Sequence, residues 1–237
     1  MSKPFRFKEF SVEQDKCAMQ IGTDGVLLGA WTTIPKNTFS ILDIGAGTGV
    51  IALQMAQRSQ AELIDAIEIE ENAYEQCVEN FENSPWNDRL FCYHASLEEF
   101  TEEIDESYDL IVSNPPFYDE DFTSVEATRN TARFTEALPF SELIKNVAKL
   151  LSEKGNFSLI IPHKNQEEVL QLAKEAGLYL QKITLVQGNA DTPVKRNLLQ
   201  FSFTEVALEK TQLVIEKERH QYTQEYKDLV KAFYLKM

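Results

Sequence analysis

A glycine-rich turn between a strand and a helix is the feature of this sequence that most restricts its fold. Residues 39–44 form an apolar run that predicts a strand, and Gly45-Ala46-Gly47-Thr48-Gly49 follows it directly. A helical segment then runs from Val50 to about Gln57. Glycines let the backbone approach a ligand, and a helix start offers unpaired N–H groups. The sequence therefore predicts an α/β fold with a nucleotide-like ligand at this turn, although its Gly-x-Gly-x-Gly spacing differs from the Gly-x-Gly-x-x-Gly of dinucleotide-binding folds.

Polar residues end the next two predicted strands. Residues 63–68 form a strand that ends in Glu68, at the distance beyond the turn where dinucleotide-binding folds place an acidic ribose ligand. Glu68 is therefore expected to accept hydrogen bonds from both hydroxyl groups of an adenosine ribose. Residues 90–94 form a third strand, and Ala95 and Ser96 follow its carboxyl end.

Three further polar residues near these strands are interpreted as structural. Glu70 and Glu71 are expected only to face solvent at the start of a helix over residues 72–83. His94 ends the third strand, where a histidine is more often structural than catalytic.

Asn114-Pro115-Pro116-Phe117 follows the fourth predicted strand, residues 108–113. Ligands of parallel sheets bind at the carboxyl ends of the strands. The tandem prolines fix φ and remove two N–H donors, so the stretch offers carbonyl oxygens and the Asn114 amide oxygen as acceptors, beside the ring of Phe117. Two acceptors and a flat apolar face suit a planar amine. The alternative is a proline-stiffened turn with no chemical role.

The segment after this motif is expected to face the substrate. Residues 118–138 show no clear periodicity, and loops of this length in compact domains are usually functional or mobile. Arg129 and Arg133 are interpreted as phosphate contacts. For each arginine, a surface salt bridge is the alternative.

Two adjacent strands are predicted near the C-terminus, over residues 179–186 and 197–203. A strand pair after a series of strands and helices suggests a final antiparallel hairpin. The loop between the two strands ends in Lys195 and Arg196, a further candidate basic contact.

The length of 237 residues fits one α/β domain, residues 1–237, with appendages. We expect an N-terminal strand and helix extension over the ligand site (1–35), a catalytic core (36–204) and a C-terminal strand and helix appendage (205–237). No apolar run approaches the roughly 20 residues that span a bilayer, and the N-terminus lacks the apolar core of a signal peptide. A cytoplasmic protein is expected.

Charge and cysteine content restrict the partners. The net charge of −15 argues against a general nucleic-acid binder, because phosphate contacts normally need a basic surface, but it leaves room for a local basic patch. Cys17, Cys77 and Cys92 are widely spaced and contain no Cys-x-x-Cys pair, which supports neither a disulfide framework nor a metal site. A monomer is expected.

Six stretches carry a resemblance that covers nearly the whole chain. They are Asp15-Lys16-Cys17-Ala18-Met19, residues 22–31, residues 42–49, Ser84-Pro85-Trp86, Asn114-Pro115-Pro116-Phe117 and Ala232-Phe233-Tyr234-Leu235. In these stretches the chain resembles the bacterial methyltransferases that modify adenine N6 next to the anticodon of a valine tRNA. The glycine and proline motifs define only the superfamily, and the N-terminal stretches narrow it to this group.

The resemblance implies a Rossmann-like class I methyltransferase, an α/β fold with a seven-stranded, mostly parallel sheet and an antiparallel final hairpin. It implies S-adenosyl-L-methionine as cofactor, a tRNA as partner and no metal. The implied cofactor ligands are Asp24, Asp43, Gly45, Ala46, Gly47, Gly49, Glu68, Ala95, Ser96 and Asn114. The implied catalytic residues are Asn114, Pro115, Pro116 and Phe117, and the implied substrate contacts are Phe117, Tyr118, Arg129 and Arg133. Ser96 replaces the acidic residue that usually holds the cofactor's adenine amine, which predicts either a weaker contact there or one that shifts to the backbone.

Three alternatives to this function stay open. The same acceptor chemistry serves methylation of a glutamine amide in a release factor, and net acidity makes a protein substrate easier to accept. A ribosomal RNA adenine or guanine N-methyltransferase is the second alternative. The third is a noncatalytic RNA-binding module that has kept the fold.

Overall fold

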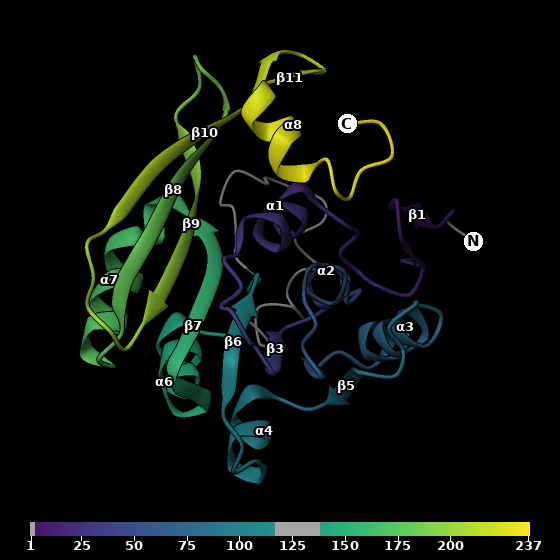
Figure 1. Cartoon of the computed structure of the whole chain (residues 1–237), viewed down its shortest axis with the longest axis vertical. Coiled ribbons are helices and arrows are strands. Elements are labelled where there is room, and N and C mark those ends of the chain that lie inside the picture. The colour runs from purple at the N-terminus through teal and green to yellow at the C-terminus, as the bar shows by residue number, and fades with distance from the viewer. Residues whose placement is uncertain (1–2, 117–137) are drawn as a thin grey trace, which may run out of the picture.

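The computed structural model describes residues 3–116 and 138–237. The strands of its main sheet are β3 (Ser40–Ile44), β4 (Leu63–Glu68), β5 (Leu90–His94), β6 (Tyr108–Ser113), β7 (Leu151–Pro162), β8 (Tyr179–Asn189), β9 (Val194–Ser202), β10 (Glu209–Glu218) and β11 (Gln221–Tyr222). They lie in the order β11-β10-β8-β9-β7-β6-β3-β4-β5 (Figure 1). The stretch from β8 to β5 is the predicted seven-stranded sheet, in which only β9 runs antiparallel to its neighbours.

Helices cover both faces of the sheet (Figure 1). They are α1 (Thr23–Trp31), α2 (Val50–Arg58), α3 (Glu71–Glu82), α4 (Leu97–Glu103), α6 (Phe140–Leu150), α7 (Gln166–Glu175) and α8 (Gln224–Val230). One buried cluster joins α1, α2, α3 and α8 to the sheet, and a second joins α4, α6 and α7 to the opposite face. In α6, for example, Leu143, Ile144, Val147 and Leu150 are buried at helical spacing, which defines the face that packs on the sheet.

The central strands are apolar because they are covered on both faces. All five residues of β3 are buried, and five of the six residues of β6 are. These two strands are parallel neighbours, with Ile44 opposite Ser113. Ser113 Oγ also donates a hydrogen bond to the Ile44 carbonyl (2.9 Å). The glycine turn and Asn114 therefore leave the same edge of the sheet side by side.

The two terminal segments of the chain pack against each other. A separate hairpin of β1 (Phe5–Arg6) and β2 (Ser11–Val12) lies near the C-terminal tail, with a bridge between Phe7 and Tyr234. The Lys8 N–H donates to the Phe233 carbonyl (2.8 Å). Farther along the sheet, β10 pairs in parallel with β8. The C-terminal residues thus extend the main sheet by two strands beyond the predicted seven.

Some local features differ from the sequence expectation. Helix α4 was not predicted. Strands β8 and β9 are longer than expected, so the loop between them shrinks to residues 190–193. Glu70 does more than face solvent, since its side chain caps α3 by accepting from the N–H groups of Asn72 (3.2 Å) and Ala73 (2.8 Å).

Candidate active site

The turn between β3 and α2 uses backbone conformations that glycine adopts most easily. Gly45, Gly47 and Gly49 have φ values of 72°, 55° and 77°, in the left-handed region that side chains disfavour. Gly49 is also closely packed, since a Cβ there would lie 2.5 Å from Cε1 of Phe81 and 2.8 Å from Sγ of Cys77. Among the described residues, nothing lies within 4 Å of a Cβ built on Gly45 or Gly47. A ligand can therefore approach the backbone at these two residues.

Glu68 supports the turn from the neighbouring strand. Its Oε2 accepts a hydrogen bond from the Gly47 N–H (2.7 Å), and its Oε1 accepts one from the Glu70 N–H (3.0 Å). An ionised carboxylate has about four acceptor sites, so Glu68 retains capacity for ribose hydroxyl groups. Its role as a ribose ligand stays a prediction, and its contact with the turn is a feature that the sequence did not reveal.

Asp43 lies at full burial between β3 and α2. Its Oδ2 accepts a hydrogen bond from the Ala52 N–H in the first turn of α2 (3.0 Å). Within the described part of the chain, Oδ1 has no hydrogen-bond partner. Burial raises the pKa of this carboxyl to about 7 because the charged form is poorly solvated there. Asp43 thus offers a buried polar atom next to the glycine turn.

Ser96 and its neighbours mainly organise α4. The Ser96 hydroxyl accepts from the Glu99 N–H (3.2 Å), and Oε2 of Glu99 accepts from the Ser96 N–H (3.0 Å), which forms a capping box. The Ser96 hydroxyl also donates to Oε2 of Glu99 (2.8 Å). His94 stacks on Tyr74 with ring centroids 5.1 Å apart, and its Nε2 contacts the Ile69 carbonyl (3.0 Å). These contacts are consistent with a structural histidine. The cofactor contacts of Ala95 and Ser96 stay predictions.

Asn114 follows β6 next to the start of α1. Its side-chain oxygen Oδ1 is buried and has no hydrogen-bond partner among the described residues. A Cβ built on Gly25 would lie 3.9 Å from Asn114 Nδ2, which places the first turns of α1 against this side chain. Pro115 is buried and Pro116 is exposed. Phe117, Tyr118, Arg129 and Arg133 lie outside the described residues.

Helix α1 connects this site to the hairpin of β8 and β9. Asp24, in the first turn of α1, forms an ion pair with Arg196 of β9, with Nε 2.8 Å from Oδ2. Asn197, the next residue in β9, is fully buried. Its Oδ1 lies 3.0 Å from Nδ1 of His163, and its Nδ2 donates to Oε1 of Gln166 (2.8 Å). The sequence predicts Arg196 as a candidate basic contact, and the resemblance implies Asp24 as a cofactor ligand. The structure pairs these two residues with each other.

Asn80 joins the N-terminal segment to the glycine turn, a role that the sequence did not reveal. The buried Nδ2 of Asn80 donates to the carbonyls of Glu13 and Thr48, both at 2.9 Å, and its Oδ1 accepts from the Glu13 N–H at 2.8 Å. Nearby, burial raises the pKa of Cys17 to about 12, and the charge of Glu68 contributes to this shift. The thiol is therefore protonated at neutral pH and is a poor nucleophile.

Comparison with known proteins shows to which protein family the chain belongs. The model of the methyltransferase small domain matches residues 21–184, more than half of the chain. A protein of Christiangramia forsetii named tRNA1(Val) (adenine(37)-N6)-methyltransferase is 56% identical over 100% of this chain and 99% of its own length. A protein of Flavobacterium psychrophilum with the same name is 59% identical over 98% of this chain and 100% of its own length. This chain belongs to the same methyltransferase family.

Solved structures of other methyltransferases share the fold of this family member. A predicted O-methyltransferase from Agrobacterium tumefaciens superimposes with a TM-score of 0.69 at 20% identity, covering 89% of this chain and 96% of that chain. A ribosomal protein L11 methylase from Lactobacillus delbrueckii gives 0.53 at 18% identity, covering 76% and 77%. These matches confirm the predicted class I methyltransferase fold. Every helix within the described ranges is too short or too polar to cross a membrane.

Proposed function

We propose that this methyltransferase transfers the methyl group of S-adenosyl-L-methionine to the N6 amine of an adenine in the anticodon loop of a valine tRNA. The names of two relatives that match this chain over nearly its whole length support this substrate. The observation that carries the chemistry is the buried Oδ1 of Asn114, which has no partner among the described residues and lies at the sheet edge where the glycine turn begins. An amine that donates a hydrogen bond to this oxygen would give it the partner that it lacks.

The residues around the turn fit the proposed cofactor. Gly45 and Gly47 leave the backbone open to a ligand, and Glu68 keeps acceptor capacity for ribose hydroxyl groups. Oδ1 of Asp43 is a buried acceptor that has no partner in the described part of the chain. The bound cofactor supplies a methyl group on a positively charged sulfur. Asp24 and Asn114 approach from α1 and β6, so the cofactor would lie between these two elements and the turn.

Asn114 would prepare the adenine amine for the reaction. The amine is a weak nucleophile because its lone pair is delocalised into the ring. Hydrogen bonds from the amine to Asn114 Oδ1 and to the Pro115 carbonyl favour a pyramidal nitrogen, with its lone pair directed at the methyl carbon. The bound cofactor would supply the methyl group, and Asn114 Oδ1 and the Pro115 carbonyl would hold the amine in place until its surplus proton passes to water. Positioning and fixed dipoles therefore supply most of the rate enhancement.

The RNA itself lowers the cost of presenting the base. Bases of an anticodon loop are already single-stranded, so turning the adenine out of its stack costs only a few kcal/mol. Phe117 and Tyr118 follow the Pro-Pro pair in the sequence and remain the proposed stacking partners of the extruded base.

A panel of acceptors tests this proposal. The wild-type protein is incubated with S-adenosyl-L-methionine labelled in the methyl group and with unmodified valine tRNA, ribosomal RNA or a release factor. We expect label in the tRNA alone, recovered as N6-methyladenosine after digestion to nucleosides. Label in ribosomal RNA or in the release factor instead would replace the substrate by one of the alternatives. Cofactor binding without transfer to any of the three would contradict the proposal.

A further inference from the structure

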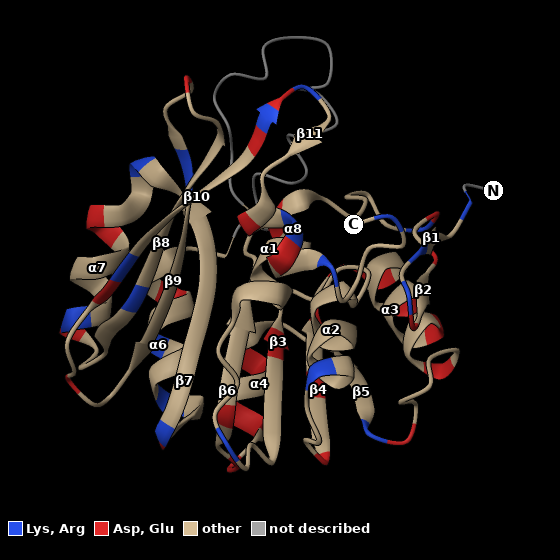
Figure 2. Cartoon of the chain, turned by 45° about the horizontal axis from the view of Figure 1, so that its top comes forward, with Lys and Arg blue, Asp and Glu red and all other residues tan. Residues whose placement is uncertain are grey.

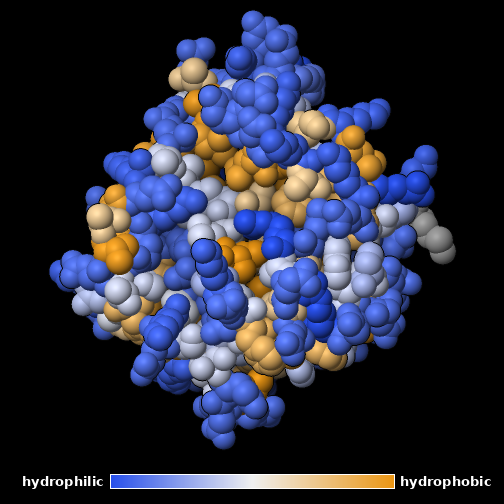
Figure 3. All heavy atoms as spheres, in the orientation of Figure 1, coloured by the Kyte–Doolittle hydropathy of each residue, from blue (hydrophilic) through white to orange (hydrophobic). Residues whose placement is uncertain are grey.

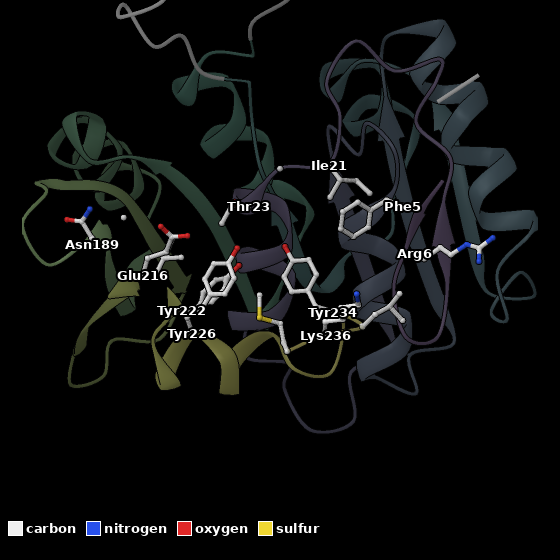
Figure 4. A pocket seen from close by; sticks show the side chains of 15 residues that line it. Phe5, Arg6, Ile21, Thr23, Asn189, Glu216, Tyr222, Tyr226, Tyr234 and Lys236 are labelled. Atoms are coloured by element: carbon white, nitrogen blue, oxygen red, sulfur yellow. The ribbon is translucent and has the colours of Figure 1, made fainter. Parts of the chain in front are cut away.

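A pocket lies at the start of α1, between β1 and the C-terminal elements. It has a volume of about 810 Å³, within the range of about 300–1,000 Å³ that is typical of ligand sites. The hairpin β1–β2, the start of α1, the end of β8, strands β10 and β11, helix α8 and the C-terminal tail all contribute to it (Figure 4). None of the functional residues inferred from the sequence is among its lining residues.

Four aromatic side chains line this pocket. Tyr222 and Tyr226 lie on one side with ring centroids 5.1 Å apart, and Tyr234 and Phe5 lie on the other with centroids 6.1 Å apart (Figure 4). Burial raises the pKa of Tyr226 and Tyr234, so both phenols stay protonated at neutral pH. The pocket therefore offers the partly exposed rings of Tyr222, Tyr234 and Phe5, whereas Tyr226 is buried. Aromatic faces of this kind stack on nucleic-acid bases without regard to sequence.

Basic side chains border the pocket although the whole chain is acidic. Arg6 and Lys236 line it and are exposed, and neither forms a salt bridge with any described residue. Lys217 and Arg219 flank the turn between β10 and β11, and Figure 2 shows basic positions at β1, at this turn and along the C-terminal tail. Glu216 is the one acidic residue among the lining side chains, all of which belong to the described chain. Two lining side chains are basic and one is acidic, so the pocket itself is slightly basic and can accept a phosphate at its rim.

The pocket and the methyl-transfer site share one end of α1. Thr23 lines the pocket, and Gly25, two residues farther along the same helix, faces Asn114. Residues two apart point to nearly opposite sides of a helix, so the pocket and Asn114 lie on either side of the start of α1. Figure 3 shows hydrophobic side chains among hydrophilic ones on the face drawn. An RNA loop that places one base at Asn114 can pass around the start of α1 and place another base here.

We propose that this aromatic pocket binds one unpaired base of the RNA substrate, a base that flanks the adenine to be methylated. The inference rests on the proposed function, because it takes the RNA acceptor as given. Stacking between Tyr222 and Tyr234 holds the flanking base, while Arg6 and Lys236 contact its phosphates. The pocket then sets the register of the loop, so that the target adenine reaches Asn114.

A substitution and a missing base test the same contact. Tyr222→Leu keeps apolar bulk but removes the aromatic face. With intact tRNA we expect the KM for RNA to rise about tenfold, the size that loss of one base stack produces, while the affinity for cofactor is unchanged. RNAs that lack one loop base beside the target adenine are then compared. When the missing base is the one that the pocket binds, the KM of the wild-type enzyme should rise about as much as in the substitution. The KM of Tyr222→Leu should not rise further with the same RNA.

Two variants serve as controls. Tyr222→Phe retains the ring and should restore the wild-type KM, which separates stacking from a general loss of structure. Tyr179→Leu removes an exposed tyrosine at the opposite end of β8 and should leave the KM unchanged. An unchanged KM in Tyr222→Leu, or additive effects of this variant and every missing base, would overturn the pocket assignment alone. A wild-type enzyme that methylates no RNA would instead contradict the proposed function.

Discussion

Single residues at the carboxyl edge of the sheet differ in how much of their hydrogen-bonding capacity the fold uses. Both oxygens of Glu68 and the hydroxyl of Ser96 have protein partners. The Oδ1 atoms of Asp43 and Asn114 are buried without a partner among the described residues. A buried acceptor left unpaired costs about 1–3 kcal/mol. A ligand that donates to these two atoms would recover that free energy, which is the physical reason for placing the chemistry here.

Glu68 is the residue whose substitution should affect cofactor binding most selectively. Glu68→Gln keeps an oxygen for the Gly47 N–H, gives up the bond from the Glu70 N–H, and removes the charge that strengthens hydrogen bonds from ribose hydroxyl groups. Because hydrogen bonds to charged groups are worth about 1.5–3 kcal/mol, the dissociation constant for S-adenosyl-L-methionine should rise at least about tenfold in calorimetric titration. Glu71→Gln, an exposed neighbour in the first turn of α3, is the matched control. Equal affinities of both variants and the wild type would exclude Glu68 as a ligand.

Asp43 should make the stability of the ligand-free protein fall with rising pH. Burial raises its pKa from 3.8 to about 7, so between these values the folded chain keeps a proton that the unfolded chain releases. Deprotonation then favours the unfolded state as pH increases. The Asp43→Asn variant cannot ionise at this position. Its free energy of unfolding is measured in urea at intervals across this range. The difference from the wild type should grow in favour of the variant up to about pH 7 and stay constant above it. A constant difference would show that Asp43 is ionised throughout.

At the scale of elements, the turn between β3 and α2 should tolerate no side chain at Gly49. Gly49→Ala requires a left-handed conformation and places a methyl group against Phe81 and Cys77. We expect a loss of at least about 2 kcal/mol in the free energy of unfolding. Gly188→Ala meets its nearest atom at an ordinary 3.6 Å and should change stability by less than about 0.5 kcal/mol. Similar stabilities of the two variants in urea would show that the turn is less constrained than described.

The sequence predicts those elements whose signals are local. Strand β3, the glycine turn and the strand before Asn114 carry continuous apolar runs and punctuating residues, so their order at the sheet edge follows from general rules of parallel sheets. The capping box of Ser96 and Glu99 is also a local pattern, because its two residues lie three apart at the start of α4. The ion pair between Asp24 and Arg196 joins residues far apart in the chain and has no local signal. The same holds for Asn80 and for the pocket of tyrosines.

At the scale of the whole molecule, the N- and C-terminal segments contact each other at Phe233. This side chain is 1% exposed, and its carbonyl accepts from the Lys8 N–H. Phe233→Ala should lower the free energy of unfolding by about 3–5 kcal/mol, the cost of an emptied aromatic site in a core. Leu235→Ala, at a residue 56% exposed, should cost less than about 0.5 kcal/mol. Thermal and urea unfolding measure the loss of stability in each variant. Equal losses in Phe233→Ala and Leu235→Ala would show that the tail does not belong to the core.

The central claim is that Asn114 prepares the acceptor amine and does not merely shape the cofactor site. The most direct measurement is the single-turnover rate of methyl transfer to valine tRNA by Asn114→Ala, with cofactor affinity measured on the same sample and Asn87→Ala, an exposed asparagine, as control. We predict that the rate falls at least about 100-fold, the usual effect of losing a preorganised contact to the reacting group, while the dissociation constant for the cofactor stays near the wild-type value. An unchanged rate, or a loss explained wholly by weaker cofactor binding, would contradict the account.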